Sequence, residues 1–373
     1  MFTPEFLRVI GFTSEEINVW TGPIAAAGFA LGIWFVPFWG VLADRHGRKP
    51  LILRSYYVEV AAMALAALSH NVWLYLVARA LTGFALGNTG LMYASLTEVA
   101  PKNRVALALG LVNGSAPMGS LVGGLLGGFV VAQFGVHWLF GLDAIVSALT
   151  AILLTTLYRE TFIPKPTPPI LVMLGDALRA VIHSPVAVTI FLVNFVTNTA
   201  TFFTFPYLPV RIGELVGQVA APTTIGVTQG VAGITTLLGS AVWGTVAERV
   251  GHRRLLAMLM LAVAMLFVPL YFAQDMVGVA VTWAMISAIN PSVSSLMFTI
   301  ISLNVPAEKR GSVLSMIYLP LNFAFIVGPF GASFIARSAE VRSVFLASSF
   351  LAFAALAIFV ASLSRTKKLD AVN

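Results

Sequence analysis

The sequence predicts an all-α integral membrane protein built from two pseudo-symmetric helix bundles. Of its 373 residues, 58% are hydrophobic and only 10% are charged, and the mean hydropathy is +0.92. A water-soluble chain of this length carries about a quarter charged residues. Apolar runs long enough to span a bilayer follow one another along the chain, and a short charged motif occurs twice, 204 residues apart. The three observations together predict a duplicated membrane bundle.

Eleven apolar runs are long enough to cross a membrane, given about 1.5 Å of rise per residue and a hydrocarbon core of about 30 Å. An open chain can satisfy its backbone hydrogen bonds there only as a helix, so each run predicts a transmembrane helix. The runs are 22–41, 51–69, 72–95, 105–130, 136–158, 186–209, 222–246, 254–273, 276–301, 311–335 and 341–364.

The repeated motif lies between the first and second runs and again between the seventh and eighth. The first copy reads Gly-Val-Leu-Ala-Asp-Arg-His-Gly-Arg-Lys-Pro over residues 40–50, and we call it the first signature turn. The second signature turn reads Gly-Thr-Val-Ala-Glu-Arg-Val-Gly-His-Arg-Arg over residues 244–254. Gly40, Asp44, Arg45, Gly47 and Lys49 match Gly244, Glu248, Arg249, Gly251 and Arg253 at one common offset of 204. This offset predicts an internal duplication with both turns on the same side of the membrane.

The first signature turn resembles the signature loop of the major facilitator superfamily of secondary transporters. In that fold the loop joins the second and third helices, and a weaker copy joins the eighth and ninth. The resemblance covers nearly the whole chain after residue 21 and implies twelve helices. Only one run precedes the first turn here, and residues 1–21 resemble the exterior loop between the first two helices. We therefore expect the first helix to be missing, through a misassigned start codon, a truncated gene or a true eleven-helix protein.

The halves implied by this duplication are an N-terminal bundle of five helices (1–158) and a C-terminal bundle of six (186–373). Residues 159–185 form the linker, where four prolines in 164–169 favour an extended spacer. Seventeen Lys and Arg residues lie on the side of the signature turns, against four on the other. By the positive-inside rule, the signature turns, the linker and the C-terminus are cytoplasmic in a multi-pass protein of the plasma (inner) membrane.

The resemblance implies that the signature turns form a conformational latch. Asp44 would pair with loop arginines and face a helix N-terminus of the other half while the cavity is open outward. A carboxylate at a helix N-terminus can bias a two-state equilibrium in this way. The alternative is a solvated turn whose charges only set topology. The residues assigned to the latch are Gly40, Asp44, Arg45, Gly47, Arg48, Lys49, Glu248, Arg249, Gly251 and Arg253.

Three charged residues inside the runs are candidates for proton coupling. Arg79 lies several residues inside 72–95, where a charge costs about 2.5–3.5 kcal/mol on insertion scales and should face protein or water. With Gly83 it resembles the Arg-x-x-x-Gly element of the superfamily's fourth helix, which is associated with proton-coupled transport. Glu59 and Asp143 are the two clear intramembrane acids. A structurally paired arginine, and an interfacial position for Asp143, remain the alternatives.

Glycines punctuate the run 105–130 at spacings of four and five, a pattern that lets a neighbouring helix approach closely. The run resembles a degenerate copy of the Gly-Pro-rich fifth-helix motif of drug:proton antiporters, with ordinary small-residue packing as the alternative. The residues assigned to helix packing are Gly83, Gly114, Pro117, Gly119, Gly123 and Gly124.

Amides and aromatic residues fall in runs that the resemblance assigns to cavity-lining helices. Few charges and many amide, Met and aromatic groups suit amphipathic organic ligands better than phosphorylated ones. Aromatic side chains facing lipid would produce the same pattern. The candidate cavity residues are Asn113, Asn194, Asn198, Gln229, Asn290, Asn322, Phe202 and Tyr318.

These observations favour a proton-coupled transporter that expels drugs or other small amphipathic compounds by alternating access. We expect a small-molecule substrate, protons and the lipid bilayer as partners, no nucleic acid, and a monomer. The five histidines show no ligand spacing for a metal, there is no cysteine, and no phosphate-binding GxxxxGK[ST] appears. We therefore expect no metal, no cofactor and no enzyme activity. A sugar or metabolite symporter or facilitator of the same fold, and a non-transporting scaffold or truncated pseudo-transporter, are the alternatives.

Overall fold

The computed structural model describes residues 1–101, 104–160, 181–305 and 316–370, with five further positions at 172, 175, 178, 179 and 313. Most of the expected linker 159–185 therefore lies outside the described residues. Within them every regular element is helical. In the N-terminal half the helices are α1 (Thr3–Val9), α2 (Ser14–Gly32), α3 (Val36–His46), α4 (Lys49–Ala67), α5 (Val72–Leu81), the 3₁₀ turn η1 (Thr82–Ala85), α6 (Asn88–Val99), α7 (Val105–Phe134) and α8 (Val136–Leu157).

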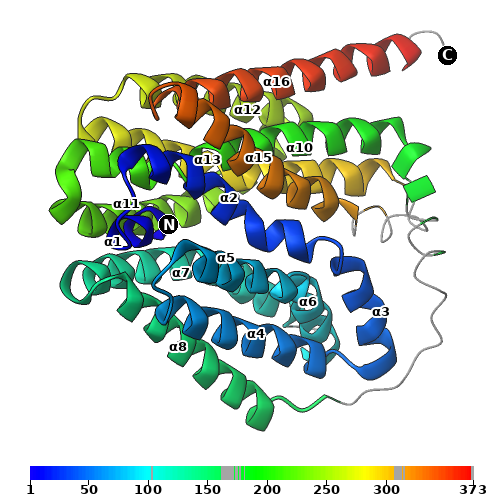
Figure 1. Ribbon diagram of the computed structural model, residues 1–373. Coiled ribbons are helices and arrows are strands. Elements are labelled where there is room, and N and C mark those ends of the chain that lie inside the picture. Colours follow the sequence, from blue (N-terminus) through cyan, green and yellow to red (C-terminus); the bar gives the residue numbers. More distant parts are fainter. Residues whose placement is uncertain are drawn as a thin grey trace.

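The C-terminal half continues with long helices that lie above the first half in Figure 1. They are α10 (Pro185–Thr204), α11 (Leu208–Val250), α12 (His252–Phe272), α13 (Met276–Asn304), α15 (Tyr318–Ser338) and α16 (Ser343–Asp370). Eight continuous helical stretches are long and apolar enough to cross a membrane, and Pro185–Val250 counts once although it holds both α10 and α11. Two further spans are interrupted: α2 with α3, and α5 with η1 and α6. When α10 and α11 are counted separately and these two are added, the described chain has the eleven spans predicted from sequence.

The helix pairs repeat between the halves, which supports the predicted duplication. Helix α4 packs against α8 as α12 packs against α16, and α2 packs against α5 as α11 packs against α13. In the C-terminal half α10 packs against both α15 and α16. No described helix takes the equivalent place beside α7 and α8. Accordingly 22% of the most apolar stretch of α8 is buried, against 39% for α16.

The first interrupted span corrects the expected boundaries of run 22–41. Helix α2 begins at Ser14, where the Thr13 hydroxyl accepts from the Glu16 N–H and the Glu16 carboxylate accepts from the Thr13 N–H. This capping box starts the helix eight residues earlier than hydropathy indicates. Residues 1–21 are thus largely helical and not the loop that was expected. The span then breaks between α2 and α3 at residues 33–35.

The second interrupted span is the run 72–95, which the structure divides into α5, η1 and α6. The close crossing of Gly83 with α2 explains the position of the break. A Cβ on Gly83 would lie 2.1 Å from the carbonyl oxygen of Gly28, and one on Gly32 would lie 2.1 Å from that of Gly83. The backbone turns at Gly87, whose φ is 86°, and α6 begins at the next residue. The 3₁₀ turn therefore lies where two backbones meet.

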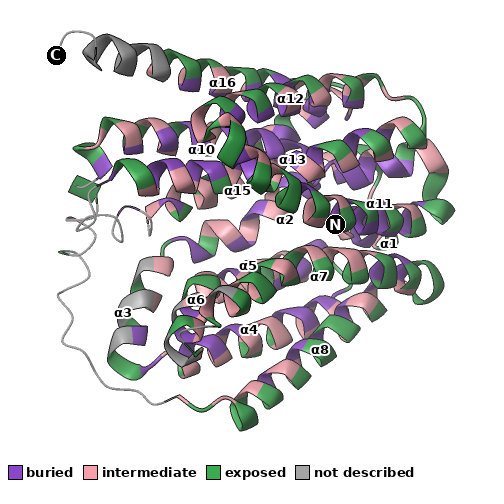
Figure 2. Cartoon of the chain, turned by 180° about the vertical axis from the view of Figure 1, so that it is seen from behind, coloured by how far each residue is buried: buried purple, intermediate pink, exposed green. Residues whose placement is uncertain are grey.

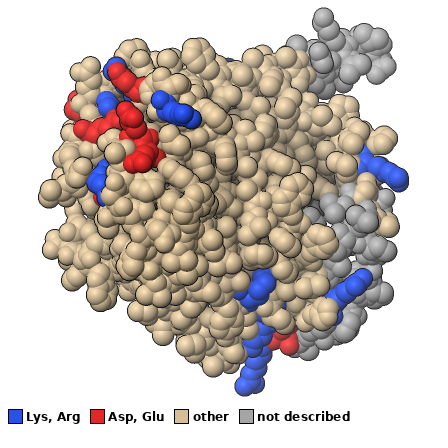
Figure 3. Space-filling view, viewed as in Figure 1, with Lys and Arg blue, Asp and Glu red and all other residues tan. Residues whose placement is uncertain are grey.

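The molecular surface is that of a membrane protein. Buried residues follow the helix faces inside each bundle, and the outward faces are exposed (Figure 2). Large apolar side chains such as Trp138, Leu149 and Ile152 are more than half exposed. On the face in Figure 3, charged side chains gather near two opposite margins, with an uncharged surface between them. An apolar belt of this kind is suited to lipid and not to water.

Candidate functional site

The two signature turns adopt the same backbone geometry. Gly47 ends α3 with φ of 91°, and Gly251 ends α11 with φ of 89°. The N–H of each glycine donates to the carbonyl four residues earlier, that of Ala43 or Ala247. A positive φ is a conformation that glycine adopts without strain, so the repeated glycine fixes each turn. We call the end of the molecule that carries these turns the turn end.

A pair of reciprocal contacts ties the first signature turn to the end of α8. The Glu160 carboxylate accepts from the N–H groups of Arg48 and Lys49, both at 2.8 Å, at the start of α4. The Lys49 ammonium donates to the carbonyls of Thr155 and Tyr158, at 2.8 and 2.5 Å, at the end of α8. An acid thus lies at a helix N-terminus and a base at a helix C-terminus, the arrangement that helix dipoles favour. Glu160 was missed from sequence, although its position directly after an apolar run was a usable signal.

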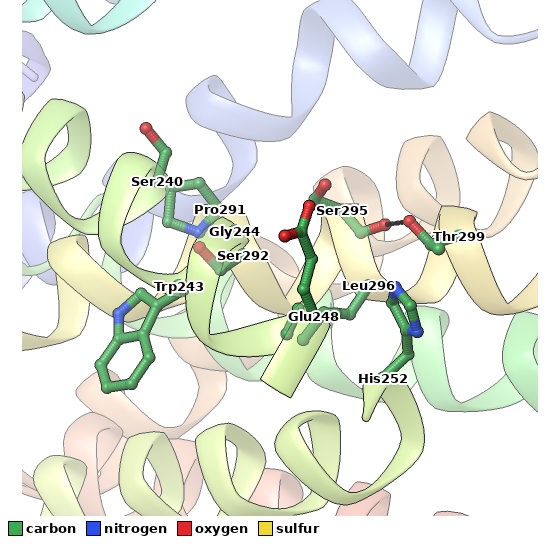
Figure 4. A pocket seen from close by; sticks show the side chains of 11 residues that line it. Ser240, Trp243, Gly244, Glu248, His252, Pro291, Ser292, Ser295, Leu296 and Thr299 are labelled. Atoms are coloured by element: carbon green, nitrogen blue, oxygen red, sulfur yellow. Dashed lines mark hydrogen bonds between the residues drawn. The ribbon is translucent and has the colours of Figure 1, made fainter. Parts of the chain in front are cut away.

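The acids of the two signature turns differ in what the structure describes. The side chain of Asp44 and the burial of Gly40 lie outside what the structure describes. Arg45 is exposed. Glu248 is exposed and forms no ion pair among the described residues. It borders a cavity of about 190 Å³ between α11 and α13, with side chains from the facing sides of both helices (Figure 4). The latch role of these residues stays a prediction.

The halves contact each other at the end opposite the signature turns. The contact is carried by α7 with α11 and by α2 with α15. A Cβ on Gly124 would lie 3.0 Å from the carbonyl oxygen of Gly226, and one on Gly22 would lie 2.1 Å from that of Pro329. The Tyr207 hydroxyl, fully buried, donates to the carbonyl of Asn18 at 2.7 Å across the same interface.

Of the small residues assigned to helix packing, three need a correction. Gly124 contacts α11, Gly83 contacts α2, and the Pro117 carbonyl meets Gly233. Gly114, Gly119 and Gly123 instead face open space, with nothing within 4 Å of an added Cβ. Gly328, the counterpart of Gly123 at an offset of 205, packs against Phe202 of α10. Gly123 lacks such a neighbour because no described helix takes the place of α10 in the N-terminal half.

A stack of three aromatic rings joins the halves near mid-membrane. Phe29 of α2 stacks on Phe325 of α15 at 3.9 Å between ring centroids, and Phe325 stacks on Phe202 of α10 at 3.6 Å. Phe202 was predicted to line the cavity, and the structure places it in this stack. Along α2 and α15, the stack lies closer to the turn end than the Gly22–Pro329 contact.

On the turn-end side of this stack, aromatic and amide groups from both halves face one another. Tyr318 of α15 lies near Tyr93 of α6, and the Tyr93 hydroxyl donates to the Asn113 amide oxygen at 2.6 Å. Phe298 of α13 packs against Tyr318 at 5.5 Å. Tyr318 is 43% exposed although it lies within a span. Tyr93, Asn113, Phe298 and Tyr318 form the candidate substrate site, of which Tyr93 and Phe298 were not selected from sequence.

The remaining candidate amides lie mostly inside the C-terminal bundle. Asn194 and Asn198 are buried; Asn194 donates to the carbonyl of Ile317 at 3.1 Å, and Asn198 donates to the Asn194 side-chain oxygen. Gln229 accepts from the Trp283 indole at 3.2 Å, and Asn290 donates to Thr201 at 3.1 Å. Asn322 is half-buried. These bonds are what helix packing requires, so a cavity role for these residues stays a prediction.

The three candidate coupling residues belong to one electrostatic group. Glu59 interacts with both Asp143 and Arg79, and Arg79 also interacts with Asp143. Arg79 is half-buried, and its Nε has no hydrogen-bond partner among the described groups. Asp143 is exposed and accepts from the Ser147 hydroxyl at 3.4 Å. The structure therefore brings together charges from α4, α5 and α8 that the sequence could only note separately.

Comparison of the sequence with known proteins identifies a family and several relatives. The model of the family described as Major Facilitator Superfamily matches residues 1–220 and 190–372. "Multidrug resistance protein MdtG" of Klebsiella pneumoniae is 25% identical over 350 residues, covering 93% of this chain and 85% of that protein. Its namesake from Serratia proteamaculans is 27% identical over 353 residues, with 92% and 84% covered.

Solved structures show the same architecture at low identity. A variant of the nucleoside transporter NupG matches with a TM-score of 0.80 and 13% identity, covering 96% of this chain and 93% of that one. The human organic anion transporter MFSD10 matches with a TM-score of 0.68 and 16% identity, covering 95% and 87%. At such identities the likeness concerns the fold alone.

Proposed function

The chain belongs to the Major Facilitator Superfamily, and from that premise we propose that it expels small amphipathic organic compounds, drugs among them, in exchange for protons. The observation that carries the proposal is the similarity over more than nine tenths of the chain to proteins named for multidrug resistance. The uncharged candidate site of Tyr93, Asn113, Phe298 and Tyr318 agrees with it. Aromatic and amide groups bind amphipathic molecules without demanding a fixed charge or shape.

The transport cycle in this proposal is alternating access by rocking of the two halves. With the signature turns on the cytoplasmic side, as the distribution of Lys and Arg favours, the described arrangement would be an inward-facing state, since the halves meet at the other end. The Gly124–Gly226 and Gly22–Pro329 contacts close the exterior end. Rocking would separate these contacts and bring the turn ends together, where Asp44 and Glu248 latch onto the opposite half. The protein would perform this cycle as a monomer in the cytoplasmic membrane.

Proton coupling in this proposal uses the group of Arg79, Glu59 and Asp143. Charge within a span is costly, so protonation of either carboxylate changes the energy of the whole group. The acids lie on the packed pair α4 and α8, and Arg79 lies in the span that contacts α2 through Gly83. A proton taken up there would alter the packing of α5 and η1 on α2, the helix that meets the other half at α15.

Substitution of Asp44 tests the efflux function and the latch together. We expect cells that express the Asp44→Asn protein to accumulate more ethidium and related dyes than cells with the unaltered protein. Losing about 1–2 kcal/mol at a helix N-terminus would change the outward-facing population about 5- to 30-fold.

The matched control is Glu15→Gln, an exposed acid at the opposite end, which should transport normally. Equal membrane abundance of both variants would exclude an insertion defect. Normal efflux by Asp44→Asn would contradict the latch. Dye accumulation that the unaltered protein leaves unchanged across a broad panel would contradict drug efflux itself.

Substitution of Tyr318 tests the substrate site. We expect Tyr318→Ala to raise the apparent KM for aromatic dyes about threefold to tenfold, because an aromatic contact contributes about 0.5–1.5 kcal/mol. Tyr57, an exposed tyrosine on α4, offers the control Tyr57→Ala. Equal effects of the two substitutions would place the binding site elsewhere.

A further inference from the structure

A second cavity lies at the start of α12, beside the second signature turn and separate from the candidate substrate site. Its volume is about 440 Å³, and its lining residues are Gly251, His252, Arg253, Arg254, Ile300, Leu303 and Asn304. It is formed where the second signature turn meets the last turn of α13. We call it the α12 cavity.

The polar part of the α12 cavity is basic. His252, Arg253 and Arg254 line it, and no acidic side chain among the described residues does. The Arg253 guanidinium is held in place by the Asn304 amide oxygen, to which it donates at 2.9 Å. None of the ion pairs among the described residues includes His252, Arg253 or Arg254. Two arginines and a histidine with no acidic partner among the described residues favour a ligand of negative charge.

The repeat within this molecule shows what the equivalent position binds. His252 and Arg253 correspond at the offset of 204 to Arg48 and Lys49, whose N–H groups hold the Glu160 carboxylate at 2.8 Å. The N-terminal half therefore supplies an anion at the start of α4 from its own chain.

The positions of the C-terminal half that correspond to Glu160 carry no acid. Helix α16 lies beside α12 as α8 lies beside α4, but the residues 204 and 205 after Glu160 are Ser364 and Arg365. The anion that Glu160 supplies in the N-terminal half therefore has no counterpart at the equivalent position beside α12.

We propose that the α12 cavity binds the phosphate of an anionic phospholipid. The apolar part of its lining favours a lipid over free phosphate, because Ile300 and Leu303 adjoin the bases and Leu303 is 67% exposed. Farther along α12, Met258, Leu261 and Met265 are exposed on an outer surface that suits acyl chains. A basic pocket beside apolar helix surface at a membrane boundary is the chemistry that recognises an anionic headgroup.

The experiment measures thermal unfolding of the purified full chain in a zwitterionic detergent during titration with short-chain phosphatidylglycerol. The unaltered protein should gain a saturable increase in Tm, since a ligand that binds the folded state stabilises it. In the double variant Arg253→Gln, Arg254→Gln, the apparent affinity should fall on the order of tenfold or more. Phosphatidylcholine and inorganic phosphate at the same concentrations are the comparison ligands.

The matched control removes two arginines from the same end of the molecule but outside the cavity, as Arg104→Gln, Arg159→Gln. This control should keep the response of the unaltered protein, and the charge-preserving Arg253→Lys, Arg254→Lys should keep most of it. An equal loss in the control and the cavity variant would refute the site, as would full binding by the Gln variant. A full response to inorganic phosphate would refute a lipid ligand. These outcomes do not depend on drug efflux, because no transport is measured.

Discussion

At the scale of single residues, glycine decides how closely helices approach. Gly83 was selected from sequence as part of an Arg-x-x-x-Gly element, and the structure shows its backbone against that of Gly28. The same reasoning selected Gly114, Gly119 and Gly123, where an added Cβ would meet nothing within 4 Å. Both outcomes have one cause: spacing predicts a smooth helix face, but the presence of a neighbour on that face depends on tertiary structure.

Replacing Gly83 tests this packing. We expect Gly83→Ala to destabilise the protein by about 1–3 kcal/mol, because the added methyl would overlap the Gly28 carbonyl and the chain must move apart. Thermal unfolding of the purified protein measures the loss. Gly90→Ala, in the same interrupted span with open space at its Cβ, is the control and should unfold like the unaltered protein. A Gly83→Ala protein of unchanged Tm would contradict the close crossing.

At the scale of helices, the sequence predicts where spans lie better than where they break. Runs 51–69 and 136–158 coincide with α4 and α8 to within a few residues. The breaks after α2 and α5 were not predicted, because hydropathy reports composition and a break depends on backbone contacts with another helix. The start of α2 at Ser14 was missed for a different reason: its cap is polar and precedes the apolar run.

The contacts between α4 and α8 permit a test at this scale. We expect Glu160→Gln to cost about 1–2 kcal/mol of stability, because a neutral amide replaces the carboxylate that two N–H groups share. Hydrogen exchange should quicken in the first turn of α4 and remain unchanged in α12. As a control, Glu214→Gln removes an exposed acid from its pair with Arg211, and should cost less than about 1 kcal/mol. Unchanged exchange in α4 of the Glu160 variant would show that the cap contributes nothing.

At the scale of the molecule, the duplication was predicted and the conformational state was not. The offset of 204 identified two equivalent turns, and Gly47 and Gly251 confirm them in backbone geometry. Which end of the halves would be in contact could not be inferred, because both states of a rocking bundle are compatible with one sequence. The group of Arg79, Glu59 and Asp143 was likewise beyond prediction, since its members are distant in the chain.

Distance measurements between spin labels test the rocking motion. The chain has no cysteine, so introduced cysteines are the only labelling sites. We expect the distance between labels at His46→Cys and Leu303→Cys, both at the turn end, to shorten when a transported substrate and a low exterior pH drive the cycle. The distance between Asn71→Cys and Ala339→Cys, at the other end, should lengthen. Parallel changes at both ends, or none at either, would contradict rocking of rigid halves.

The stack of Phe29, Phe325 and Phe202 has a consequence for the energy supply of the cell. Ring centroids 3.6–3.9 Å apart leave no room for water between the rings, so no file of water can pass between these three side chains. A carrier driven by an ion gradient must not also conduct those ions freely, or it would discharge the membrane it depends on. We expect the three rings to oppose such a leak where the halves meet, because their side chains carry no charge to attract a proton.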